Sequence, residues 1–182
     1  MKARLAAALL ALASLTAQAE EPLPTVPQVD LARYAGRWYE IARLPMYWQR
    51  DCVAEVSADY ALREDGAIAV HNRCRVADGR YIEADGVARV ADPAAGNARL
   101  QVRFAPSWLG FLPFIWGDYW ILALDPDYQW ALVGEPGREY LWILARTPEL
   151  DAAIEARLVE RAAELGFDVS QLIRPQGDGE GR

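Results

Sequence analysis

The most informative segment of the chain is Gly36-Arg37-Trp38-Tyr39-Glu40-Ile41-Ala42-Arg43, in which two kinds of side chain alternate. One phase of the run carries Trp38, Glu40 and Ala42, and the other carries Tyr39, Ile41 and Arg43. Such alternation predicts a strand with two different faces. Gly36 permits a close backbone approach where the chain enters the strand.

Similar alternating segments follow, separated by turns such as Glu64-Asp65-Gly66, where glycine accepts a positive φ. The predicted strands cover about residues 37–44, 52–62, 67–76, 80–91, 99–104, 117–124, 128–134 and 139–146. This pattern predicts an all-β fold, an eight-stranded up-and-down antiparallel barrel, which removes exposed sheet edges. A two-sheet sandwich is the alternative.

One C-terminal helix is predicted after the last strand. Thr147 suits its N-cap, Pro148 its first position and Glu149 its first turn. The helix presents an apolar stripe and stops at Gly166; the stripe consists of Leu150, Ile154, Leu158 and Leu165. Because the strand over 140–145 is apolar on both phases, we expect the helix to pack outside the barrel.

The chain divides into a leader, one domain and a tail. Residues 1–19 resemble a secretory signal peptide, with an apolar core too short to span a bilayer; an uncleaved anchor is the alternative. We expect residues 20–28 to be an irregular leader, 29–174 the barrel domain and 175–182 a disordered tail. The formal net charge of −7 argues against a nucleic-acid partner.

Cys52 and Cys74 are the two cysteines of the chain, and an even count in an exported protein favours one disulfide. Pairing Leu62 with Ile68 in the hairpin sets Cys74 opposite Val56 rather than Cys52. A bridge therefore needs a bulge or a curled strand end. Two buried free thiols are the alternative.

With these elements in order, the chain resembles the lipocalins over residues 29–174. The residues that match the family's three structural signatures are Gly36, Trp38, Asp127, Tyr128 and Arg146. Pro126 stands where the second signature usually has threonine. The resemblance implies that Arg146 packs across Trp38 at the closed end of the barrel. Within the family the chain is similar to the bacterial lipocalins, which are related to apolipoprotein D and the plant temperature-induced lipocalins.

The resemblance implies binding or transport of small hydrophobic ligands, above all lysophospholipids or fatty acids, in the cell envelope. Storage, transfer or membrane maintenance would be the purpose. Many bacterial members are outer-membrane lipoproteins, but this chain has no cysteine near its predicted cleavage site. We therefore expect an exported periplasmic protein, associated at most peripherally with the outer membrane.

Family topology and alternation together place one set of side chains inside the barrel. The predicted ligand-binding residues are Tyr60, Val70, Asn72, Leu100, Val102, Phe104, Tyr119, Leu132, Tyr140 and Trp142. Asn72 and Tyr119 are the polar candidates for orienting a head group. A barrel filled by these side chains, with no cavity, is the alternative.

Residues 106–116 form an almost wholly apolar connection, whereas loops normally face water. The segment suits a membrane interface, with contacts predicted from Trp108, Leu109, Phe111, Leu112, Phe114 and Trp116. A lid over the barrel or a dimer contact is the alternative role of this segment. We expect the protein to be a monomer or a homodimer. Docking through this loop without transport is the alternative function.

Catalysis is not expected, and neither is a cofactor or a metal. The single histidine, His71, lies on a polar phase and is interpreted as a solvated surface residue. Asp125 and Asp127 fall in a turn, where a structural role fits. A free Cys52 or Cys74 inside the barrel would permit the cysteine chemistry of a few lipocalin enzymes, and a disulfide would remove it.

Overall fold

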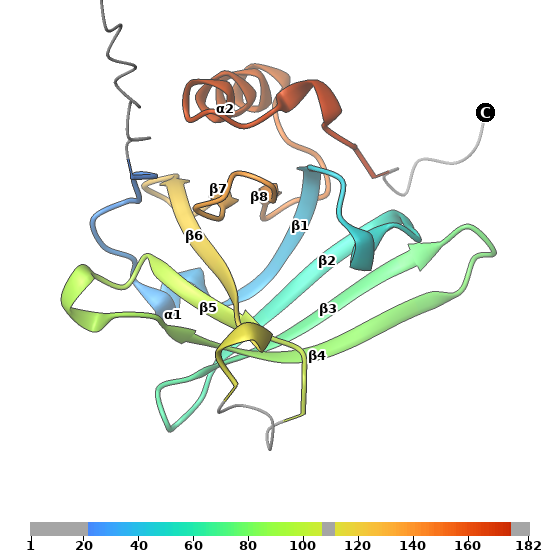
Figure 1. Ribbon diagram of the computed structural model, residues 1–182. Helices are drawn as coiled ribbons and strands as arrows, with labels where there is room; N and C mark the ends of the chain where they lie inside the picture. Colours follow the sequence, from blue (N-terminus) through green and yellow to red (C-terminus); the bar gives the residue numbers. More distant parts are fainter. Residues whose placement is uncertain (1–21, 107–111, 176–182) are drawn as a thin grey trace, which may run out of the picture.

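The computed structural model describes residues 22–106 and 112–175, which fold into a closed barrel (Figure 1). Its strands are β1 (Gly36–Arg43), β2 (Cys52–Leu62), β3 (Ile68–Val76), β4 (Tyr81–Val90), β5 (Arg99–Arg103), β6 (Gly117–Leu124), β7 (Trp130–Gly134) and β8 (Leu141–Ala145). Each strand pairs antiparallel with its neighbours in chain order, and β8 pairs with β1. The predicted up-and-down barrel is confirmed, and the sandwich is excluded.

Five short helical turns lie before, between and after these strands in the described residues. They are α1 (Leu31–Tyr34), η1 (Tyr47–Gln49), η2 (Pro93–Ala95), η4 (Pro113–Ile115) and η5 (Val169–Gln171). The Asp30 side chain caps α1 by accepting hydrogen bonds from the backbone N–H groups of Ala32 and Arg33. The Asp30 cap therefore fixes where α1 begins, directly before β1.

The long helix α2 (Ala152–Glu164) packs outside the barrel, as expected (Figure 1). Its N-cap is Asp151, whose carboxylate accepts hydrogen bonds from the N–H groups of Ala153 and Ile154. The predicted cap at Thr147 is wrong, because that hydroxyl donates to the Glu149 carbonyl in a turn before the helix. Asp151 satisfies two N–H groups that the helix itself leaves unpaired.

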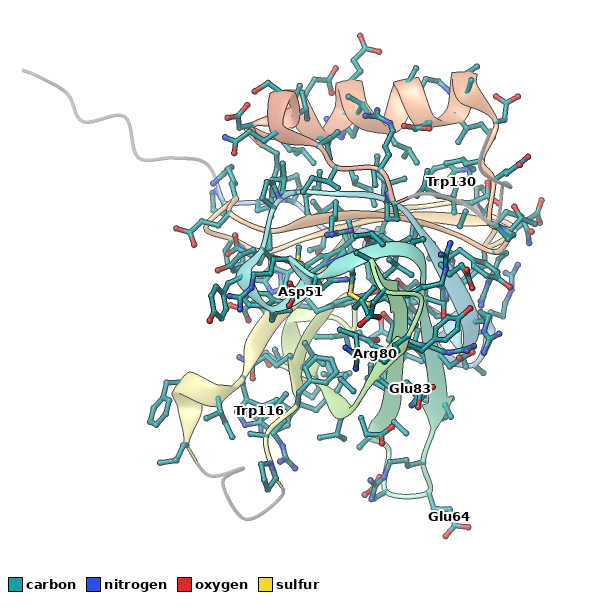
Figure 2. All side chains as sticks on the ribbon, turned by 90° about the vertical axis from the view of Figure 1, so that its right-hand side faces the viewer. Asp51, Glu64, Arg80, Glu83, Trp116 and Trp130 are labelled. Atoms are coloured by element: carbon teal, nitrogen blue, oxygen red, sulfur yellow. A yellow bond between two sulfur atoms is a disulfide. The ribbon has the colours of Figure 1, made fainter. Side chains whose placement is uncertain are left out.

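The apolar stripe of α2 covers the outer faces of β6, β7 and β8. Leu158, Ala162 and Leu165 are buried against this outer surface. The barrel residues that form this outer surface are Leu122, Leu132, Leu141 and Ile143. Figure 2 shows Trp130 of β7 on the same side as α2. The last strands are therefore apolar on both faces because the helix covers one and the barrel interior the other.

A β-bulge in β1 changes which side chains share a face. The β1–β8 register shifts between Glu40 and Ala42, so Glu40 pairs with Leu144 and Arg43 pairs with Trp142. Simple alternation had separated Glu40 from Arg43, and that prediction is wrong. The extra residue brings both side chains to the inner side of the strand, since a bulge re-aims the side chains that follow it.

The β2–β3 hairpin has the predicted pairing of Leu62 with Ile68, and its register shifts twice toward Cys52. Glu55 has a positive φ of 48° in this irregular part of β2. The shifts bring Cys52 and Cys74 to a Cα–Cα distance of 5.5 Å, within disulfide range, and the two are bonded. The predicted disulfide and its need for a bulge are confirmed.

The closed end of the barrel is built around Trp38, which is fully buried. The Arg146 guanidinium lies 3.9 Å from the centre of the Trp38 ring, as the resemblance implied. The same group donates hydrogen bonds to the carbonyls of Arg33, Arg37 and Tyr34. Arg146 thus ties β8 to both α1 and β1.

The turn between β6 and β7 completes this end. The Asp125 carboxylate accepts hydrogen bonds from the N–H groups of Asp127 and Gln129, which gives Asp125 the turn role that the sequence indicated. Tyr128 takes a positive φ of 61°, and its hydroxyl accepts a hydrogen bond from Asp30 N–H at 2.8 Å. The signature residues therefore hold the fold closed.

Candidate functional site

A cavity of about 580 Å³ occupies the barrel interior, so the filled-barrel alternative is wrong. The predicted residues that line it are Tyr60, Val70, Asn72, Leu100, Val102, Phe104, Tyr119, Tyr140 and Trp142. Leu31 and Tyr34 of α1 bound it at the closed end. Most of the lining is aliphatic or aromatic, which suits an apolar ligand.

Leu132 does not belong to this lining. It pairs with Ile143, and both pack in the cluster beneath α2. The neighbouring Val133 pairs with the cavity-lining Trp142 and packs in the inner core. Because side chains alternate along a strand, Val133 and Leu132 cannot share a face. Leu132 of β7 was predicted from the sequence to face the cavity, whereas it is its neighbour Val133 that faces inward.

Three tyrosines meet near the closed end of the cavity. The hydroxyls of Tyr34 and Tyr119 lie 2.8 Å apart, and the Tyr60 hydroxyl donates to that of Tyr119 at 3.1 Å. Burial raises the pKa of Tyr60 to about 12 and raises those of Tyr34 and Tyr119 well above 10.0. The cluster is therefore neutral at physiological pH, and its two hydrogen bonds use two of its three O–H protons.

Asn72 supplies a different kind of polar group. Its side chain lines the cavity from β3, and its Oδ1 atom is buried with no hydrogen-bond partner among the described residues. A buried acceptor without a partner costs free energy that a ligand donor can recover. Of the two predicted polar candidates, Asn72 has an acceptor without a hydrogen-bond partner among the described residues, whereas the Tyr119 hydroxyl is hydrogen-bonded to Tyr34 and Tyr60.

A polar network that the sequence analysis missed lies along the cavity wall. Glu40 and Arg43 form an ion pair with 2.6 Å between Oε1 and Nη1, and both are buried. Gln49 of η1 donates from Nε2 to Glu40, and its Oε1 accepts a hydrogen bond from Trp142 Nε1. Burial raises the pKa of Glu40, and the Arg43 guanidinium opposes that shift.

This network holds η1 at the rim of the cavity. The Arg43 Nη2 atom donates to the carbonyls of Gln49 and Cys52 at 3.0 Å each. Trp48 of η1 lines the cavity and packs on Tyr140, with 4.7 Å between ring centres. The only indication of this network in the sequence was the pair Glu40 and Arg43, three residues apart. In a regular strand these two side chains face opposite sides, and only the β1 bulge brings them together.

The apolar connection between β5 and β6 is described in part. Trp108, Leu109 and Phe111 lie outside the described residues. Leu112 is half-buried, Phe114 of η4 is 80% exposed, and Trp116 is half-buried. Phe104, just after β5, is 44% exposed and also lines the cavity. The cavity therefore opens beside exposed aromatic side chains.

None of the helices in the described residues is both long enough and apolar enough to cross a membrane. His71 is partly exposed at the surface, where its Nδ1 lies 2.8 Å from Asp85 Oδ1. Within the described part of the chain, no group of three His, Cys, Asp or Glu side chains is placed to hold a metal ion.

An antiparallel barrel of eight strands in sequence order, with a ligand-sized cavity and an outer helix, defines the lipocalin class. The model of the lipocalin-like domain family matches residues 29–177. The chain belongs to the lipocalin family, whose members bind small hydrophobic ligands.

Curated relatives of the chain come from plants, bacteria and animals. Temperature-induced lipocalin-1 of Arabidopsis thaliana is 42% identical over 161 residues, covering 87% of this chain and 86% of the relative. Outer membrane lipoprotein Blc of Escherichia coli (strain K12) is 37% identical over 174 residues, covering 95% of this chain and 93% of the relative. Apolipoprotein D of Mus musculus is 31% identical over 160 residues, covering 83% and 79%.

Solved structures agree on the fold. Insecticyanin from the tobacco hornworm Manduca sexta has a TM-score of 0.63 at 20% identity, covering 85% of this chain and 82% of that structure. The cockroach allergen Per a 4 also has a TM-score of 0.63, at 18% identity, with 85% and 91% covered. At these identities the likeness concerns the barrel alone.

Proposed function

We propose that this protein binds and carries single-chain lipids, lysophospholipids above all and fatty acids second, in the cell envelope. The observation that carries the proposal is the apolar cavity of about 580 Å³, which lies within the usual range of 300–1,000 Å³ for small-molecule sites. Val70, Val102 and Leu100 offer aliphatic walls to an acyl chain.

Asn72 supports the preference for lysophospholipids. Its buried Oδ1 is a hydrogen-bond acceptor with no partner among the described residues, so it favours a ligand that brings a donor. A lysophospholipid carries a free glycerol hydroxyl, whereas an ionised fatty acid has no donor. Asn72→Leu should therefore weaken lysophospholipid binding about tenfold and leave fatty-acid binding little changed.

The envelope is the proposed location. The predicted signal peptide over residues 1–19 and the Cys52–Cys74 disulfide both fit an oxidising compartment. Blc relatives are outer membrane lipoproteins, as their name states. We propose that this chain is exported to the periplasm and touches membranes peripherally, through the apolar side chains of Leu112, Phe114 and Trp116. The disulfide occupies both thiols, so neither Cys52 nor Cys74 is available as a nucleophile.

Native mass spectrometry of the protein purified from the periplasm of its own cells tests the proposal. The expected spectrum contains a complex of one protein and one lysophospholipid or fatty acid, which organic extraction removes. A barrel that stays empty in the cell and against a panel of both lipid classes would contradict it. That result would favour the alternative, an interaction protein that docks through the β5–β6 connection.

A further inference from the structure

The arginines of the barrel strands fall into two groups. Four of them form ion pairs with carboxylates: Arg37, Arg43, Arg73 and Arg75. Arg89 of β4 and Arg99 and Arg103 of β5 have no carboxylate within ion-pair distance among the described residues. In a chain of net charge −7, neighbouring cations left without counter-charges stand out as a local feature.

By strand alternation these three side chains share the outer face of β4 and β5, and Arg103 also borders the cavity. Arg89 follows the inward Ala88, Arg99 precedes the inward Leu100, and the strands pair Arg89 with Gln101. Gln101 accepts a hydrogen bond from Arg89 and donates a long one, 3.4 Å, to Asp118. Further along β4, the Asp85 carboxylate is hydrogen-bonded to His71 of the neighbouring strand β3.

Aromatic rings hold the three guanidinium groups in place. The Cζ atoms of Arg89 and Arg103 lie 3.9 and 5.1 Å from the centre of the Trp116 ring. Arg99 Cζ lies 4.6 Å from the centre of the Trp120 ring. A guanidinium stacked on a ring keeps its charge and several in-plane N–H donors for an oxyanion. Phosphate matches that donor geometry.

Exposed aromatic side chains continue this surface toward the cavity. Phe114 of η4 is 80% exposed, and Phe104 directly follows Arg103 and lines the cavity. In both views η4 lies on the side of the barrel opposite α2, and Figure 2 shows Trp116 on that side (Figures 1 and 2). Aromatic rings beside cations are typical of a headgroup interface.

We propose that this arginine face, made of Arg89, Arg99 and Arg103 with Trp116 and Phe114, docks on the phosphate groups of an anionic lipid bilayer. Docking would bring the cavity opening beside Phe104 to the lipid surface. The docking face rests on the proposed function, because it adds a charged part to the membrane contact proposed there, but binding to vesicles does not depend on a lipid in the cavity. The alternative partners are an acidic protein and a second, acidic copy of this chain. Either could pair with the three arginines, but neither explains the exposed aromatic ring of Phe114.

Vesicle co-sedimentation with the full mature chain tests the proposal. The probe is phosphatidylcholine vesicles with or without phosphatidylglycerol, at low and at physiological salt. The wild type should bind only the anionic vesicles, and salt should weaken binding because it screens exposed charges. The variant R89Q/R99Q/R103Q should bind roughly 100-fold more weakly, from about fivefold per arginine.

Two matched variants separate the face from net charge. R157Q/R161Q/R174Q removes the same charge on α2 and the segment after it, and should bind vesicles like the wild type. R89K/R99K/R103K keeps the charges and should retain most of the binding. The single variant Arg89→Gln changes an exposed side chain and should lower the affinity for anionic vesicles about fivefold. It replaces the triple variant as the test if the triple variant fails to fold.

Three results would overturn the proposal. They are equal weakening by the two Gln triple variants, equal binding to neutral and anionic vesicles, and a change of oligomeric state by R89Q/R99Q/R103Q with unchanged vesicle binding. Displacement of a fluorescent fatty acid from the cavity, measured on the same samples, keeps the two proposals apart. An empty barrel that docks refutes only the carrier function, and a loaded barrel that does not dock refutes only the docking face.

Discussion

Arg43 and Glu40 form a buried ion pair on the inner side of β1, with 2.6 Å between Nη1 and Oε1. Arg43→Met leaves the Glu40 carboxylate buried without its cation. We expect a loss of about 3–5 kcal/mol in the free energy of unfolding, because an uncompensated buried charge is costly. Urea denaturation at neutral pH measures it.

The exposed pair of Arg37 and Asp59 is the matched control. Both partners lie on neighbouring strands, and their side chains are 50% and 33% exposed. Arg37→Met should cost less than about 1 kcal/mol, since solvent screens the pair. The double variant Glu40→Leu with Arg43→Met should recover most of the loss. Equal losses for Arg43→Met and Arg37→Met would show that the buried pair carries no special weight.

Arg146 is expected to stabilise the closed end without affecting ligand binding. Arg146→Ala removes the stack on Trp38 and the donors to several carbonyls, so unfolding should become about 3 kcal/mol easier. Arg50→Ala, which removes an exposed stack on Tyr47, should cost less than about 1 kcal/mol. Unchanged stability in Arg146→Ala, or an altered affinity for lipid, would contradict this role.

The Cys52–Cys74 disulfide should stabilise the barrel by about 3 kcal/mol, because it closes a short loop in the unfolded chain. Urea unfolding of the Cys52→Ser/Cys74→Ser variant against the oxidised wild type gives the value. Alkylation of the unreduced wild type, followed by mass spectrometry, should modify no cysteine. Two modified thiols would refute the bond.

His71 gives a pH test with a single signal, because it is the only histidine. The hydrogen bond and charge of Asp85 raise the His71 pKa above 6.5. The pair therefore stabilises the fold fully below pH 6.5, and that contribution disappears as pH rises through the raised pKa. Asp85→Asn should return the pKa, followed by NMR, toward 6.5. An identical titration in both proteins would disprove the contact.

The sequence was sufficient for the barrel because hairpin turns, strand alternation and the family signatures each act locally. The pairing of Leu62 with Ile68 was predicted, and with it the need for a bulge beside Cys52. It was insufficient where one residue of register decides the face. The β1 bulge moved Arg43 inward beside Glu40, and the phase of β7 put Val133 rather than Leu132 inside.

The cavity was predicted only through the family resemblance, since an apolar inward phase fits a filled barrel equally well. Most of the residues predicted to point inward border the cavity, and their contact with a ligand stays a prediction. The Gln49 contacts with Glu40 and Trp142 were not predictable, because they join a short turn to two strands far away in sequence. The helix start was misplaced because Thr147 and Asp151 both suit a cap, and in the structure it is the Asp151 carboxylate that accepts hydrogen bonds from the N–H groups of the first turn.

Lipid titration of a cavity-blocked variant shows whether the barrel interior holds the lipid. Val102→Trp places a large ring in the cavity, whereas Gln101→Trp places the same ring on the outer face of β5. Isothermal titration with a lysophospholipid below its micelle concentration should show one site in the wild type and in Gln101→Trp. The same titration should show a loss of at least about tenfold in affinity in Val102→Trp. Equal binding by all three proteins, or no saturable binding by any, would contradict a lipid site inside the barrel.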